Sequence, residues 1–111
     1  MTQPTPSDYS FPHYLAAKRS VDDRALNRPV WDALAAALAA QQRTLDRPLA
    51  VLEAAAGIGT MVQRTFEWRL FGAQPGMVQY TAIDALPENI AAAKARLTGL
   101  PPWCALRLET A

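Results

Sequence analysis

The sequence VLEAAAGIGT, residues 51–60, joins the end of an apolar run to a glycine turn and is the best indicator of the fold of this chain. Residues 49–52 form a short, continuously apolar run, which is typical of a strand buried on both faces of a parallel sheet. Glu53 ends the run, and Gly57 and Gly59 stand at the entrance of the next helix. Glycine has no Cβ, so its backbone adopts positive φ and lets a ligand approach closely. The stretch therefore predicts a ligand-binding strand-turn-helix unit.

The segments that follow repeat the same alternation. Val62, Phe66 and Leu70 lie four apart and predict a helix that Gly72 terminates. Residues 78–83 are rich in β-branched and aromatic side chains and predict a second strand ending at Asp84. A further helix is expected from Pro87 to Gly99, and a third strand over residues 103–108.

Two helices are expected before the first strand. Ser20 and Asp23 have the spacing of a capping box and predict a short helix to Asn27. Pro29 suits the first turn of a second helix, which should run to Gln42. The whole order predicts an α/β fold, a Rossmann-like three-layer αβα arrangement with a parallel sheet and right-handed crossovers. The chain holds its N-terminal helices and its β-α-β-α-β half, divided into a flexible tail (1–10), a helical segment (11–46) and a half-domain (47–111).

Composition limits the function. The 111 residues are 50% hydrophobic and 19% charged, with a net charge of +1, so one packed domain is expected and no basic surface points to nucleic acid. Cys104 is the single cysteine, which excludes an intrachain disulfide and provides no zinc site. We expect Cys104 to be a buried apolar residue and assign His13 no catalytic role. No secretion signal or membrane span is evident in the sequence, so we expect a cytoplasmic protein without a metal.

Two classes of cofactor bind to such glycine turns. A dinucleotide needs the pattern G-x-G-x-x-G, and counting from Gly57 the third glycine would fall at Val62. A nicotinamide-dependent oxidoreductase is therefore disfavoured.

The pattern E-x-A-x-G-x-G after an apolar strand resembles motif I of the class I S-adenosylmethionine-dependent methyltransferases. Glu53, Ala55, Gly57 and Gly59 occupy its four positions, and Ala55 stands where the family usually has its first glycine. The resemblance implies that this loop wraps the methionine part of the cofactor. It also implies that the acid orients the loop or the cofactor's ammonium group.

Asp84 provides a second match, because it ends the second strand 25 positions after Gly59. An acid there can accept hydrogen bonds from both ribose hydroxyls. The run AIDALPENIAAAKARL also resembles the family's motif II region, which implies that Leu86 packs against the adenine. Upstream, residues 11–31 resemble the family's N-terminal helices, which implies that Arg19 or Tyr14 reaches the cofactor carboxylate. The resemblance covers residues 49–97, and it identifies no catalytic residue and no methyl acceptor.

Structural explanations of the same residues stay open. The glycines can form a tight turn without a ligand, Asp84 can cap a helix, and Glu53 can neutralise a neighbouring base. In the family the first strand is central to the sheet, so a chain that stops after the third strand would leave that strand as an open edge. We therefore also consider a noncatalytic, truncated remnant that binds the cofactor, or that binds a partner chain or a second copy of itself through this edge.

Overall fold

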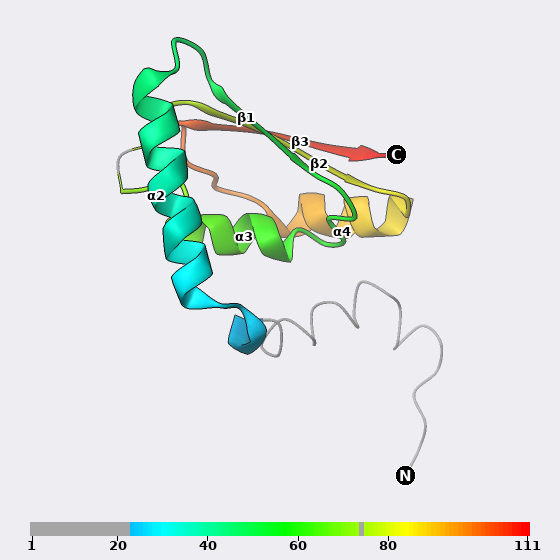
Figure 1. Cartoon of the computed structure of the whole chain (residues 1–111). Helices are drawn as coiled ribbons and strands as arrows, with labels where there is room; N and C mark the ends of the chain where they lie inside the picture. Colours follow the sequence, from blue (N-terminus) through cyan, green and yellow to red (C-terminus); the bar gives the residue numbers. More distant parts are fainter. Residues whose placement is uncertain (1–22, 74) are drawn as a thin grey trace.

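The chain folds as alternating strands and helices in a computed structural model that describes residues 23–73 and 75–111. The elements in chain order are α2 (Arg28–Thr44), β1 (Leu49–Glu53), α3 (Thr60–Glu67), β2 (Val78–Asp84), α4 (Pro87–Arg96) and β3 (Cys104–Thr110) (Figure 1). The three strands form one parallel sheet in the order β1-β2-β3. The predicted α/β fold with a parallel sheet is confirmed. None of the described helices is both long and apolar enough to cross a membrane.

The register of the sheet brings the carboxyl ends of the strands to one edge. Val51 of β1 lies opposite Tyr80 of β2, which lies opposite Leu106 of β3. Glu53 pairs with Ala82, so β2 extends two residues beyond the last pair of β1. The ends of β1 and β2 and the loops that follow them therefore meet on the same side of the molecule.

Helices α3 and α4 lie on the same side of the sheet (Figure 1). This is the expected result of two successive right-handed crossovers in the order β1-β2-β3. Val78, Tyr80 and Ala82 are buried beneath these helices, whereas Gln79, between them in β2, is exposed. The described part of the chain thus contains the sheet and one helical layer, with its core between them.

Helix α2 begins and ends close to the prediction. The side chain of Asn27 caps it by accepting a hydrogen bond of 3.1 Å from the N–H of Val30, and Pro29 lies in the first turn. Trp31 anchors the helix: its ring meets that of Trp68 edge to face at 5.3 Å, and its Nε1 donates to the Trp68 carbonyl at 3.2 Å. These contacts fix α2 to the end of α3.

Helix α3 is shorter than predicted. It ends at Glu67, and Arg69 adopts a left-handed φ of 52° that turns the chain. The turn brings Leu70 and Phe71 into the core, where they are 8% and 2% exposed. Leu70 was predicted to be the last residue of the apolar stripe of this helix. It is instead a core residue of the turn that follows the helix.

Smaller differences concern the remaining elements. Helix α4 ends at Arg96, before the predicted stop at Gly99. Strand β3 begins at Cys104 and runs to Thr110, slightly later than predicted. Cys104 is buried, as expected. Residues 23–25 are helical, in keeping with the short helix predicted to end at Asn27. His13, Tyr14, Arg19 and Ser20 lie outside the described residues.

Candidate cofactor-binding site

The loop between β1 and α3 has an unusual backbone. Ala55, Gly57 and Gly59 all have positive φ, of 54°, 60° and 86°. A side chain in this region costs about 1–2 kcal/mol relative to ordinary helical φ, and glycine avoids that cost. Ala55 therefore occupies, with strain, a conformation that a glycine would adopt freely. The loop is held to β2 by the N–H of Ala56, which donates to the Ile83 carbonyl at 2.9 Å.

Gly59 serves packing between helices. It is the N-cap of α3, and a Cβ built on it would lie 2.6 Å from Cδ1 of Leu97 at the end of α4. A side chain at position 59 would thus overlap Leu97. The glycine lets the start of α3 approach the end of α4, and this role does not involve a ligand.

Asp84 connects the glycine loop to the next turn of the chain. Its Oδ2 accepts a hydrogen bond of 3.1 Å from the N–H of Gly57, and its Oδ1 accepts one of 3.1 Å from the N–H of Leu86. Asn89 of α4 donates its Nδ2 to both oxygens, at 3.1 and 3.4 Å. The two halves of the predicted site therefore form one hydrogen-bonded unit.

The same contacts determine the charge of Asp84. Burial alone would raise the pKa of this carboxyl, but hydrogen bonds from the N–H of Leu86, the amide of Asn89 and the N–H groups of Gly57 and Ala85 outweigh it. The net effect lowers the pKa of Asp84. The group is an oriented carboxylate at neutral pH.

Glu53 is paired with a residue that the sequence analysis did not single out. The hydroxyl of Tyr80 donates to its Oε1 at 2.6 Å. Burial raises the pKa of Glu53, and the Tyr80 bond and the nearby guanidinium of Arg64 partly offset that effect. Burial and the bond to Glu53 also raise the pKa of Tyr80. Glu53 thus has a Tyr80 partner as well as the basic neighbour that the sequence analysis considered.

A groove of about 760 Å³ lies beside Glu53, between α2 and β1. Its walls are mostly apolar and include Leu34 and Leu38 of α2 and Leu52 of β1, with Glu53 and Tyr80 among its polar groups. Gly57 and Asp84 do not line it. The groove therefore adjoins the Glu53 end of the site.

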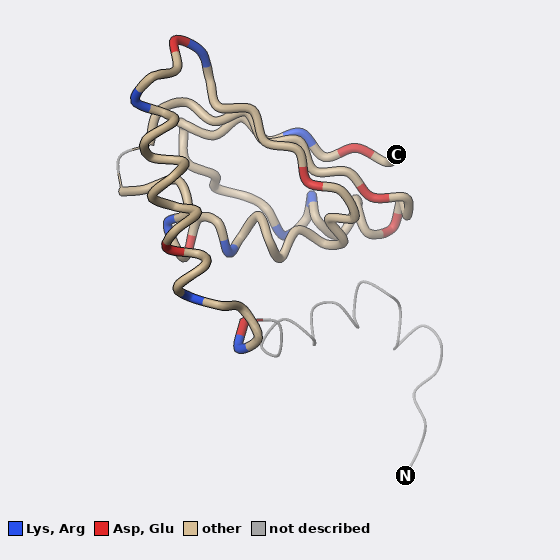
Figure 2. Tube along the Cα trace, viewed as in Figure 1, with Lys and Arg blue, Asp and Glu red and all other residues tan. Residues whose placement is uncertain are grey.

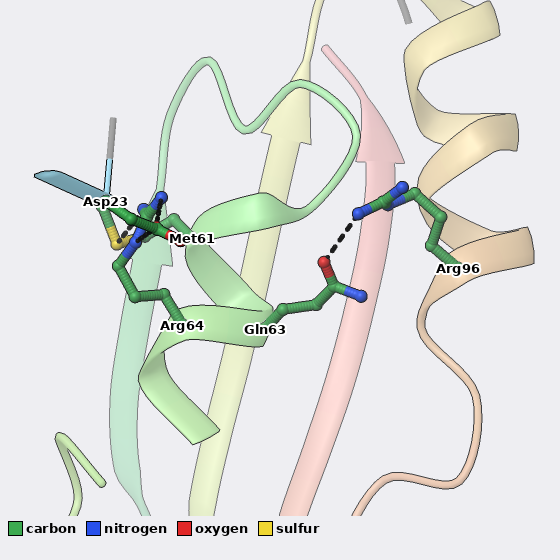
Figure 3. A network of polar contacts seen from close by, with 5 residues as sticks. All are labelled: Asp23, Met61, Gln63, Arg64 and Arg96. Atoms are coloured by element: carbon green, nitrogen blue, oxygen red, sulfur yellow. Dashed lines mark hydrogen bonds and ion pairs between the residues drawn. The ribbon is translucent and has the colours of Figure 1, made fainter. Parts of the chain in front are cut away.

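Polar contacts fix α3 from both sides (Figure 3). On one side Nε of Arg64, which is 3% exposed, donates to Oδ1 of Asp23 at 2.6 Å. On the other side Nη2 of Arg96 donates to Oε1 of Gln63 at 2.8 Å. These contacts hold the helix that begins at the glycine loop against α4 and against the segment that precedes α2.

Acidic residues gather where the strands end. Glu53 and Asp84 are the last residues of β1 and β2, whereas Glu109, near the end of β3, is paired with Arg107. Figure 2 shows these acidic positions at the carboxyl edge of the sheet, opposite the edge where the chain enters the strands. The edge therefore favours a ligand with positive charge over a polyanion.

The predicted site residues fall into three groups. Asp84, Gly57 and Leu86 are joined by hydrogen bonds, and the Leu86 side chain, at the N-cap of α4, is 38% exposed. Glu53 and Ala55 lie at the start of the same loop. Gly59 lies under Leu97, and Arg19 is outside the described residues. Tyr80 and Asn89 were not predicted from the sequence, although a polar residue on the apolar face of α4 was a signal for Asn89.

A parallel sheet in the order β1-β2-β3, with a glycine loop after β1 and an acid at the end of β2, is part of the Rossmann-like fold of class I S-adenosylmethionine-dependent methyltransferases. Among solved structures, the chain is similar to the plantazolicin methyltransferase BpumL in complex with SAH, S-adenosylhomocysteine. The TM-score is 0.50 at 18% sequence identity, over 96% of this chain and 37% of the BpumL chain. The likeness shows the fold, and this chain spans little more than a third of that protein.

A second structure of BpumL, with a triazolic desmethylPZN analog and SAH, matches over the same shares of the two chains. Its sequence identity is 18% and its TM-score is 0.47. No protein-family model matches the chain, and no curated protein matches it in sequence.

Proposed function

We propose that this chain binds S-adenosylmethionine and is the cofactor-binding part of a methyltransferase. The observation that carries the proposal is the bond between Asp84 and the N–H of Gly57, because it joins the two predicted contacts into one preformed unit. Residues 47–111 would form the cofactor-binding half-domain and residues 11–46 the helical segment before it. The single cysteine favours a cytoplasmic location.

The residues at the carboxyl edge suit this cofactor in charge and shape. Glu53 would face the positively charged methionine part, Ala55, Gly57 and Gly59 would form the loop around it, and Leu86 would lie against the adenine. Asp84 would accept a ribose hydroxyl, and Arg19 remains the predicted contact of the cofactor carboxylate. A dinucleotide is less suitable, because its pyrophosphate would meet an acidic edge. NADH is therefore the appropriate negative control.

The cofactor supplies an electrophilic methyl group, and this chain's residues bind and orient it for an acceptor held elsewhere. No described residue needs to exchange a proton for that role. The acidic edge and the glycine loop would hold the charged end, and the Asp84 unit would hold the sugar. BpumL was crystallised with SAH and desmethylPZN analogs. For this chain we infer binding of the cofactor only, and we propose no acceptor.

Site variants test the assignment of residues. Asp84→Asn should weaken binding of S-adenosylhomocysteine by about 1–3 kcal/mol, the cost of replacing a charged hydrogen-bond acceptor. Glu109→Gln, which removes an exposed acid near the end of β3, should leave the dissociation constant unchanged. Fluorescence titration of the three proteins provides the comparison. Equal affinity of the wild type and Asp84→Asn would exclude Asp84 from the site.

A second candidate function rests on the free edge of β1. The N–H of Leu49 donates to the Met77 carbonyl at 2.9 Å, so the alternate residues Ala50 and Leu52 direct their peptide groups away from β2. No described strand pairs with this side, and Leu52 is 70% exposed. Antiparallel pairing of two copies about Ala50 would place Arg47 opposite Glu53. The chain would then act as a noncatalytic dimer.

Light scattering over a range of protein concentrations tests the dimer. If β1 pairs with its copy, Leu52→Lys should shift the protein to the monomer, because it replaces an exposed apolar side chain on the edge strand with a charged one, which opposes strand pairing. Gln79→Lys adds the same charge to the same face of the sheet in β2 and should leave the dimer intact. A monomer at all concentrations in the wild type would reject this candidate.

A further inference from the structure

Asn89 is a polar residue on the buried face of α4. Its side chain is 0% exposed, beside Ile90 and Ala93, which are 5% and 1% exposed. An amide in such a place destabilises the folded chain unless its polar atoms are hydrogen-bonded. An apolar side chain would therefore be expected at position 89 if its role were packing alone.

The amide of Asn89 is directed at Asp84. Its Nδ2 lies 3.1 Å from one carboxylate oxygen and 3.4 Å from the other, so it faces the gap between them and fixes the plane of the carboxylate. A carboxylate only accepts hydrogen bonds, so the nitrogen must be the atom that faces it. Among the described residues, Oδ1 of Asn89 has no hydrogen-bond partner. The fold thus tolerates a buried, unpaired oxygen in order to place this donor.

Three parts of the chain together hold the carboxylate. Gly57 contributes an N–H from the β1–α3 loop, Leu86 contributes one from the turn after β2, and Asn89 contributes its amide from α4. A carboxylate has about four acceptor positions, so these donors, together with the N–H of Ala85, leave it little rotational freedom. Asp84 is 9% exposed, so its remaining free surface is small.

On the basis of the proposed cofactor binding, we propose that Asn89 is a positioning residue that holds the Asp84 carboxylate in the orientation that accepts a sugar hydroxyl. The side chain does not touch the ligand. It acts through Asp84, so its contribution should appear only with ligands that carry ribose hydroxyls.

Two nucleosides separate this role from a general effect on folding. The wild type should bind adenosine roughly tenfold or more tightly than 2′,3′-dideoxyadenosine, because the second leaves the carboxylate without a ligand donor. In Asn89→Leu this ratio should fall to about three or less, while the affinity for the dideoxy compound stays the same. Glu88→Gln, an exposed neighbour in the first turn of α4, should keep the wild-type ratio.

The outcomes distinguish the two proposals. Equal weakening of both nucleosides by Asn89→Leu, with the ratio preserved, would show a purely structural role and overturn the inference. A wild type that binds both compounds equally would overturn it as well. A wild type that binds neither these nucleosides nor S-adenosylhomocysteine would overturn the proposed function itself. Asn89→Ser is measured in parallel, with circular dichroism as the check of folding, because it removes the amide without adding apolar bulk.

Discussion

Ala55 and Gly59 share the left-handed backbone region, with φ of 54° and 86°. At Ala55 the conformation is strained, because a Cβ is present where the loop turns. At Gly59 the absent Cβ serves a second purpose, since Leu97 occupies the space that it would need. The motif's spacing identified both residues, but only the packed structure separates these two roles.

Ala55→Gly should stabilise the chain, although most alanine-to-glycine changes destabilise. Relief of positive φ is worth about 1–2 kcal/mol, and the greater freedom of the unfolded chain costs about 0.4–1 kcal/mol. A net gain of about 0.5–1 kcal/mol should appear in urea unfolding. Ala54→Gly is the control, because Ala54 does not have positive φ and should show only the loss. Destabilisation by Ala55→Gly equal to that of the control would show that position 55 is unstrained.

Gly59→Ala should destabilise more than Gly72→Ala. The two glycines have similar φ, 86° and 90°, but a Cβ at Gly72 meets nothing within 4 Å. Gly72→Ala should therefore cost about 1 kcal/mol, and Gly59→Ala about 1–3 kcal/mol more, because it must also displace Leu97. Thermal and urea unfolding measure both. Equal losses would mean that Leu97 moves aside without cost.

At the scale of elements, helix α3 depends on contacts from segments on either side of it. Arg64 pairs with Asp23 before α2, and Gln63 pairs with Arg96 of α4 (Figure 3). Because the glycine loop leads directly into α3, these contacts also fix the end of that loop at the start of α3. Removing the partner of a buried cation strongly destabilises the folded chain. The contact of Arg64 with Asp23 should therefore contribute more stability than the contact of Arg96 with Gln63.

Asp23→Asn tests the strength of this contact. The guanidinium of Arg64 is 3% exposed and the Asp23 side chain 30% exposed, so the loss should be about 1.5–3 kcal/mol, as for hydrogen bonds to charged groups. Glu109→Gln removes the partner of Arg107, in a pair whose side chains are 44% and 67% exposed, and should cost less than about 1 kcal/mol. Chemical unfolding compares the two variants. Similar, small losses would show that α3 does not depend on the Asp23 contact.

The sequence was most informative about elements that depend on local patterns. The apolar run of β1, the β-branched run of β2, and Pro29 and Pro87 at the helix starts predicted these elements closely. The end of α3 was predicted wrongly, because the burial of Leu70 and Phe71 is a tertiary requirement that overrides helical periodicity.

Only part of the candidate site could be predicted, because some of its contacts depend on tertiary packing and not on local sequence patterns. Glu53, Gly57 and Asp84 follow from spacing along the chain. The bonds from Tyr80 to Glu53 and from Asn89 to Asp84 join residues of different elements, so they depend on sheet register and helix packing. Asn89 was detectable as a polar interruption of an apolar helix face, whereas Tyr80 fits a strand pattern without any functional role.

At the scale of the whole molecule, two boundaries of the sheet offer different kinds of binding surface. Its carboxyl edge is acidic and carries the hydrogen-bonded unit around Asp84 (Figure 2). Within the described residues, no strand pairs with the outer side of β1, which carries the exposed Leu52, and β3 forms the opposite lateral edge. The first boundary suits a small, positively charged ligand, and the second suits another strand. The carboxyl edge is the stronger candidate site, because its groups are already ordered by hydrogen bonds.

Isothermal titration calorimetry of the purified chain with S-adenosylhomocysteine, and with NADH for comparison, tests whether this chain binds the proposed cofactor. We expect saturable binding of S-adenosylhomocysteine with one site per chain, and no heat of binding with NADH. Absence of S-adenosylhomocysteine binding by a chain that circular dichroism shows to be folded, or tighter binding of NADH, would contradict the proposal.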